Sequence, residues 1–168
     1  MGTPTWKRLG NVSVGRANLG LEMPVLVYRL AQACQKDVLV KHFGDDKAKE
    51  LIRESGAAAG TEFYNNVLAE EGLHFDSFVA KLQAALRDLK IGILKVESAD
   101  LSNFRLVFSV AEDVSCSGMD IYNETVCNYE EGFIASILKC FTGFDWNVVE
   151  VDCWATGDRV CRFSAVKK

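Results

Sequence analysis

The first half of the chain carries apolar residues at helical spacing. Leu26, Leu30, Cys34 and Val38 lie four residues apart, which places them on one side of a helix. The pattern predicts a helix over residues 25–43, with this stripe turned toward a core.

Two more helices are predicted before the pattern changes, over residues 45–68 and 76–90. The first contains the segment GAAAG, in which Gly56 and Gly60 lie on one helical face. Each glycine costs a helix about 1 kcal/mol relative to alanine, so we expect a closely packed neighbour to compensate. That neighbour is either another helix of the same chain or a second copy of it.

After residue 90 the pattern indicates strands. Residues 91–98, 104–110, 146–153 and 159–166 are short, rich in β-branched residues and partly alternating, whereas 129–141 has helical period. Helices, two strands, one helix and two further strands predict an α+β fold, an antiparallel four-stranded sheet packed against helices.

Length and charge limit what this fold could do. The 168 residues suit a single domain, which we place at 21–168 after an irregular arm at 1–20. The net charge of −4 argues against a nucleic-acid partner. No apolar run reaches the roughly 20 residues of a membrane span, and the first residues do not resemble a signal peptide. We therefore expect a cytoplasmic protein.

Six cysteines are many for a cytoplasmic chain, where clustered thiols more often bind metals than form disulfides. Cys153 and Cys161 flank a predicted hairpin, and Cys127 stands at a predicted helix start, which favours its thiolate. With Glu150 they would complete a tetrahedral Zn²⁺ site. Residues 150 and 153 face opposite sides of a regular strand, so the strand must bend, bulge or end near Asp152.

The same cysteines have two other interpretations. They could be small buried apolar residues, or Cys153 and Cys161 could form a disulfide. Cys116 is interpreted as a loop cysteine, and Cys34 and Cys140 as core residues because they occupy apolar helical positions.

Several motifs together resemble one family. The run C-x-Y-x-x-G-F-I-A from Cys127 to Ala135 is followed by E-x-D-C and by A-T-G-D-x-x-C-R-F. These motifs are similar to vinyl-4-reductase (4-vinyl reductase) domains, which are related to the aromatic-sensing domains of phenol-responsive activators and to small subunits of trafficking complexes. The resemblance implies a homodimer, and a zinc ion bound by Cys127, Glu150, Cys153 and Cys161.

The resemblance also implies a ligand pocket between helices and sheet. The positions that correspond to a histidine and a tryptophan of the phenol sensors hold Phe78 and Leu106 here. The candidate pocket residues are aromatic or apolar, with one histidine: Phe63, Tyr64, His74, Phe78, Phe104, Leu106, Phe108, Tyr129, Phe133 and Trp146. Taken singly, most of them are equally typical of an ordinary core.

The function that follows is a binding module for a small hydrophobic, aromatic or tetrapyrrole ligand, braced by structural zinc. The alternative is an accessory or assembly factor of (bacterio)chlorophyll metabolism or photosystem assembly, acting as carrier or dimeric scaffold. No nucleotide-binding glycine motif or Ser–His–Asp arrangement is present, so we do not expect an enzyme. Any activity would be associated with vinyl reduction.

Overall fold

The sheet has the predicted composition. The computed structural model describes residues 5–168 and contains one four-stranded sheet in the order β1-β2-β4-β3, with every neighbouring pair antiparallel. The strands are β1 (Ile93–Asp100), β2 (Arg105–Ala111), β3 (Trp146–Asp152) and β4 (Cys161–Lys167). The expected α+β fold is confirmed.

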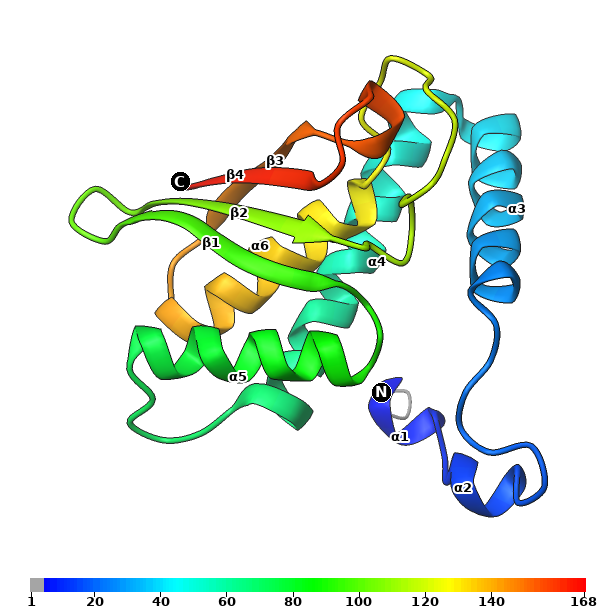
Figure 1. Ribbon diagram of the computed structural model, residues 1–168, viewed down its shortest axis with the longest axis horizontal. Coiled ribbons are helices and arrows are strands. Elements are labelled where there is room, and N and C mark those ends of the chain that lie inside the picture. Colours follow the sequence, from blue (N-terminus) through cyan, green and yellow to red (C-terminus); the bar gives the residue numbers. More distant parts are fainter. Residues whose placement is uncertain (1–4) are drawn as a thin grey trace.

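Helices cover one face of this sheet (Figure 1). Helix α6 packs along β3, α5 along β1, and α4 lies against α6. The longer helices are α3 (Val25–Phe43), α4 (Asp45–Phe63), α5 (Phe75–Asp88) and α6 (Asn128–Thr142), with a π-helical turn η1 (Tyr64–Leu68) after α4 and a short 3-10 turn η2 (Trp154–Thr156) between β3 and β4. The predicted helices are all present.

The N-terminal arm differs from its prediction. It contains two one-turn helices, α1 (Thr5–Arg8) and α2 (Val12–Gly15), neither of which buries a residue. Residues 1–4 of the predicted arm lie outside the described residues. Among residues 5–168, no helix is both long enough and apolar enough to cross a bilayer.

Helices α4 and α6 approach each other so closely that glycine is required on both. A Cβ atom at Gly56 would overlap the carbonyl oxygen of Tyr129, and one at Gly132 would overlap that of Arg53. Close packing within the chain therefore explains the GAAAG segment. Across the same contact, Arg53 donates to the buried carboxylate of Glu131, with 2.8 Å between Nε and Oε2.

Helix α3 does not face the core, so that prediction is wrong. It buries none of its residues; Leu26 is 75% and Leu30 62% exposed, and Cys34 is exposed as well. Figure 1 shows α3 standing beside the domain, at the end where the loop before α6 lies. Periodicity predicted the helix correctly, but it could not show which neighbour the apolar stripe would meet.

We predict that Gly132→Ala destabilises the fold by at least about 2 kcal/mol, because the added methyl group overlaps backbone atoms of α4 that cannot move independently. Urea unfolding measures the change. Gly15→Ala is the control, since a Cβ there has nothing within 4 Å. Equal stability of both variants would show that α4 and α6 are not in this contact.

Candidate functional site

Four cysteines meet at one end of the sheet. Cys127 is the N-cap of α6, Cys153 follows the last residue of β3, and Cys161 begins β4. Cys116 joins them from the loop between β2 and α6. All four are at most 1% exposed, and their Sγ atoms lie within 4.8 Å of one another.

The sulfur separations fit a metal centre. Two thiolates bound to one tetrahedral zinc, each at about 2.3 Å, lie about 3.8 Å apart. The Cys127 Sγ is 3.8 Å from the Sγ atoms of both Cys153 and Cys161. Within residues 5–168 no cysteine forms a disulfide, so the proposed Cys153–Cys161 bond is absent from this structure. Four buried thiols this close together could bind a metal.

Cys116 was not expected here. Its interpretation as a loop cysteine is wrong, because its Sγ lies 3.0 Å from that of Cys161 and 3.5 Å from that of Cys127. Cys140, interpreted as core, is half-buried and lies outside the cluster. The sequence offered no sign that the SCSG loop would fold back over the hairpin.

Glu150 lies beside the thiols. A bulge between Glu150 and Asp152 interrupts the pairing of β3 with β4, and β3 then ends, which supplies the break that the odd spacing of residues 150 and 153 required. The Glu150 Oε2 accepts the backbone N–H groups of Val126 and Cys127 at 3.0 and 2.9 Å. Its buried Oε1 has no hydrogen-bond partner among residues 5–168.

The site makes buried charge costly. Burial raises the pKa of Glu150 to about 8. Hydrogen bonds from Cys116 and its other neighbouring thiols lower the pKa of Cys153, while the contacts with Cys116 raise the pKa values of Cys127 and Cys161. Without a metal, the cluster therefore favours a single thiolate, stabilised by the thiols around it. A divalent cation would offset the cost of ionising the others.

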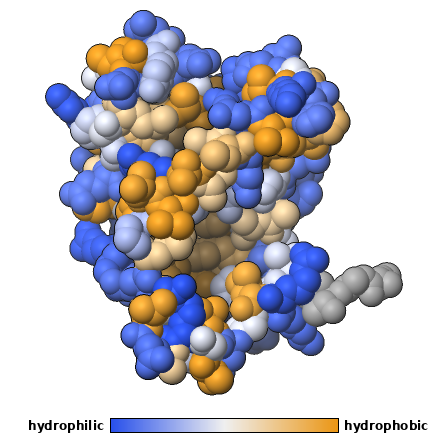
Figure 2. Space-filling view, turned by 90° about the vertical axis from the view of Figure 1, so that its right-hand side faces the viewer, coloured by the Kyte–Doolittle hydropathy of each residue, from blue (hydrophilic) through white to orange (hydrophobic). Residues whose placement is uncertain are grey.

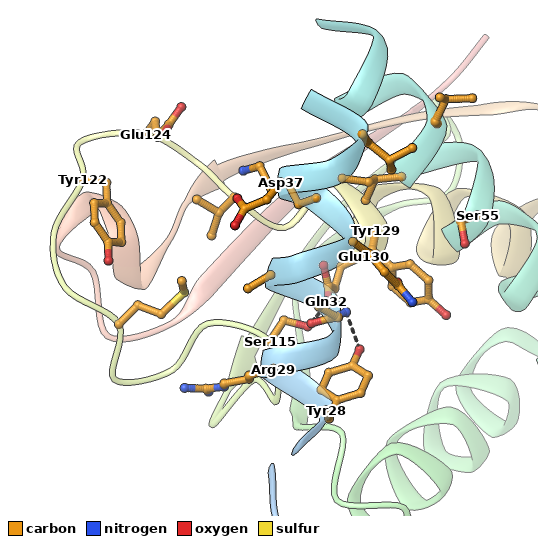
Figure 3. Close-up of a pocket in the computed structure, with 18 residues that line it drawn as sticks. Tyr28, Arg29, Gln32, Asp37, Ser55, Ser115, Tyr122, Glu124, Tyr129 and Glu130 are labelled. Atoms are coloured by element: carbon orange, nitrogen blue, oxygen red, sulfur yellow. Dashed lines mark hydrogen bonds between the residues drawn. The ribbon is translucent and has the colours of Figure 1, made fainter. Parts of the chain in front are cut away.

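A cavity of about 580 Å³ adjoins the cluster, between α3, α4 and the segment from Ser115 to Glu130 (Figure 3). It lies on the side of the molecule where Figure 2 shows apolar patches around a hollow. Its lining is Tyr28, Arg29, Gln32, Ala33, Gln35, Lys36, Asp37, Leu39, Leu51, Ile52, Ser55, Ser115, Met119, Tyr122, Glu124, Val126, Tyr129 and Glu130.

Polar groups gather on one wall of this cavity (Figure 3). The Gln32 amide donates to the Tyr28 hydroxyl at 2.6 Å, and the Ser115 hydroxyl donates to Glu130. Burial and the nearby Asp113 carboxylate raise the pKa of Glu130 to about 8. The cavity thus has an apolar part and a hydrogen-bonding pole, as small-molecule sites commonly do.

The predicted pocket residues do not converge on one cavity. Tyr129 lines the large cavity, whereas Phe108 and Phe133 line a separate space of about 40 Å³ between α5, α6 and the sheet. The others belong to the packed interior or lie away from both spaces: Phe63, Phe78 and Leu106 are buried in the core, Tyr64 packs against it, Phe104 and Trp146 pack edge-to-face with each other, and His74 is an exposed N-cap residue of α5.

Fold and site together define a class: an α+β domain whose last helix and hairpin enclose a thiol cluster. Residues 106–167 match the family model of the vinyl-4-reductase domain. The chain therefore carries a domain of this family, and the resemblance seen in the sequence motifs is confirmed.

Relatives and solved structures agree with this assignment. An uncharacterised protein of Methanocaldococcus jannaschii is 24% identical over 160 residues, 95% of this chain and 79% of that protein. A vinyl-4-reductase family structure from the same organism has a TM-score of 0.59 at 13% identity, covering 100% of this chain and 97% of the other.

Two further structures share the fold. The phenol-responsive sensory domain of the transcription activator PoxR, solved with phenol, has a TM-score of 0.69 at 13% identity, covering 88% of this chain and 76% of that one. A trafficking protein particle complex subunit 3 from Naegleria fowleri, covalently bound to palmitic acid, has a TM-score of 0.61 at 12% identity, covering 84% and 96%.

We predict that Glu130→Gln flattens the pH dependence of stability. From about pH 5 to pH 8 the folded chain keeps a proton on Glu130 that the unfolded chain has released. Folding therefore takes up a proton, and the free energy of unfolding falls as pH rises through this window. Removing the carboxyl should make that fall smaller by roughly 2 kcal/mol.

Urea unfolding at pH 5.5, 7 and 8 with saturating zinc measures the difference. Both proteins keep the thiol cluster, so its own pH dependence cancels in the comparison. The exposed Glu71→Gln is the control. Parallel curves for the wild type and Glu130→Gln would contradict the prediction.

Proposed function

We propose that this protein is a small-molecule-binding module whose cavity is braced by a structural metal centre. The observation that carries the proposal is that cavity and cluster share their walls. Ser115 lines the cavity and Cys116 joins the cluster, and likewise Val126 lines the cavity next to Cys127. A metal that draws the thiols together would hold both segments against the cavity.

The proposed ion is zinc. Cys127, Cys153 and Cys161 would hold it, with Glu150 as the oxygen ligand that the family resemblance implies; the partnerless Glu150 Oε1 fits this role. Four protein ligands leave no open position, so zinc would supply folding free energy rather than Lewis-acid chemistry. A reduced thiol cluster of this kind fits a cytoplasmic protein.

The proposed ligand is hydrophobic or aromatic. The cavity volume lies within the range of small-molecule sites, and most of the lining is apolar around one polar pole. Structures of the same fold were solved with phenol and with palmitic acid. A tetrapyrrole carrier or assembly role in pigment metabolism is supported by the family name alone.

The exposed stripe of α3 supports the proposed homodimer. Leu26, Leu30 and Val38 form an apolar row four residues apart with no partner in the described chain. Two copies of such a row cover each other across a two-fold axis, because the same residues meet on both sides. A native mass of twice the 18.6 kDa of one chain tests this arrangement.

We predict that Cys153→Ser loses the zinc and lowers the melting temperature, because a structural metal contributes its binding free energy to folding. Elemental analysis and thermal unfolding of the same sample measure both effects. Cys34→Ser is the matched control, since Cys34 is exposed on α3 and lies outside the cluster. Unchanged zinc content and melting temperature in Cys153→Ser would contradict the metal assignment.

We predict that Ser55→Trp prevents ligand retention, because the indole would occupy the cavity that Ser55 lines. Native mass spectrometry of protein purified from cells should show an added organic mass on the wild type. The variant should lose that mass and keep its metal, while Ala80→Trp, exposed on α5, should keep both.

The ligand assignment is contradicted if Ser55→Trp keeps the same added mass. It is contradicted equally if the wild type carries no organic mass and binds neither phenol nor palmitate when these are supplied.

A further inference from the structure

We infer that Cys116 is the fourth ligand of the metal centre, and that Glu150 positions Cys127 without binding the ion. The inference rests on the proposed metal site and refines its ligand set. Five side chains adjoin the site: Cys116, Cys127, Glu150, Cys153 and Cys161. A structural zinc takes four ligands, so one of the five must remain outside the shell.

The sulfur of Cys116 lies within the cluster, not at its edge. The group of side chains whose ligand atoms all lie within 4.8 Å of one another consists of the four cysteines and leaves out Glu150. Cys116 is fully buried and contacts two of the other three sulfurs, at 3.0 Å to Cys161 and 3.5 Å to Cys127. Its thiol already occupies a corner of the donor set.

Glu150 has a different task in this geometry. Its Oε2 accepts the N–H groups of Val126 and Cys127, which come just before the first turn of α6. Its own N–H donates to Glu131 Oε1 on that turn at 2.9 Å. These three bonds tie the end of β3 to the start of α6 and fix the backbone from which the Cys127 thiol projects. The free Oε1 is the one competing donor.

The loop that carries Cys116 is held in place by protein contacts. The Arg29 guanidinium on α3 donates to the carbonyls of Val114, Asp113 and Ser117, at 2.7, 3.3 and 2.9 Å. The Asp113 carboxylate accepts the N–H of Ser115 at 2.8 Å. The thiol of Cys116 is therefore preorganised toward the other three, which lowers the ordering cost of binding a metal.

This ligand set gives the metal a direct link to the cavity. Ser115, next to Cys116, lines the cavity, and Arg29 joins the same loop to α3, the opposite wall. A bond from the ion to Cys116 would hold this loop in place, whereas a bond to Glu150 would not involve it. Four thiolates also select soft ions, so Cd²⁺ and Fe²⁺ should compete with Zn²⁺ for the site.

X-ray absorption at the zinc edge tests the inference on the full chain loaded with zinc alone. We expect four sulfur neighbours at about 2.3 Å and no oxygen or nitrogen at about 2.0 to 2.2 Å. Three sulfurs and one oxygen in the wild type would overturn the inference and assign the fourth position to Glu150. No zinc uptake at all would instead refute the proposed metal centre itself.

Three variants separate the two ligand sets. Glu150→Gln should keep four sulfur neighbours, whereas Cys116→Ser should change the shell to three sulfurs and one oxygen and weaken zinc binding at least tenfold. Cys140→Ser, outside the cluster, is the control. An unchanged spectrum in Cys116→Ser would overturn the inference. If Cys116→Ser does not fold, the wild-type and Glu150→Gln spectra decide.

Discussion

The close contact of α4 with α6 is the constraint on which the site depends. Glycines on both helices let their backbones touch, and this fixes where α6 begins. Glu131, on the first turn of α6, accepts Arg53 from α4 with one oxygen and the N–H of Glu150 from β3 with the other. The start of α6 is thereby fixed to both neighbours, and Cys127 at this point faces the cysteines of the hairpin.

Buried polar groups make the region expensive without a metal. Four thiols and the carboxyl groups of Asp113, Glu130 and Glu150 lie in or beside the cluster, where burial raises the pKa values of all three acids. Such groups are retained when they are paired or when they bind an ion. A cation at the thiols would neutralise much of this charge, which ties metal binding, folding and the shape of the adjoining cavity into one equilibrium.

Helix α3 is attached more lightly than the rest. It buries no residue, and Arg29 holds it to the loop of Cys116 through three carbonyls. The cavity lies under this helix, with its polar wall on Tyr28 and Gln32. A wall with few buried contacts opens at low free-energy cost, which suits a site that must admit a ligand. A second copy of the chain covering the apolar stripe would stabilise that wall.

Local patterns in the sequence determined the elements of this fold. Periods of 3.6 and 2 depend on neighbours a few residues apart, so helices, strands and their order could be predicted, and three cluster cysteines followed from a helix start and a hairpin. The GAAAG segment likewise announced a close helix contact. Only the tertiary structure decided which helix made that contact, that Cys116 closes the cluster, and that the cavity lies under α3 rather than among the predicted aromatic residues. Each of these depends on segments far apart in the chain, whose meeting is determined by packing and leaves no periodic trace.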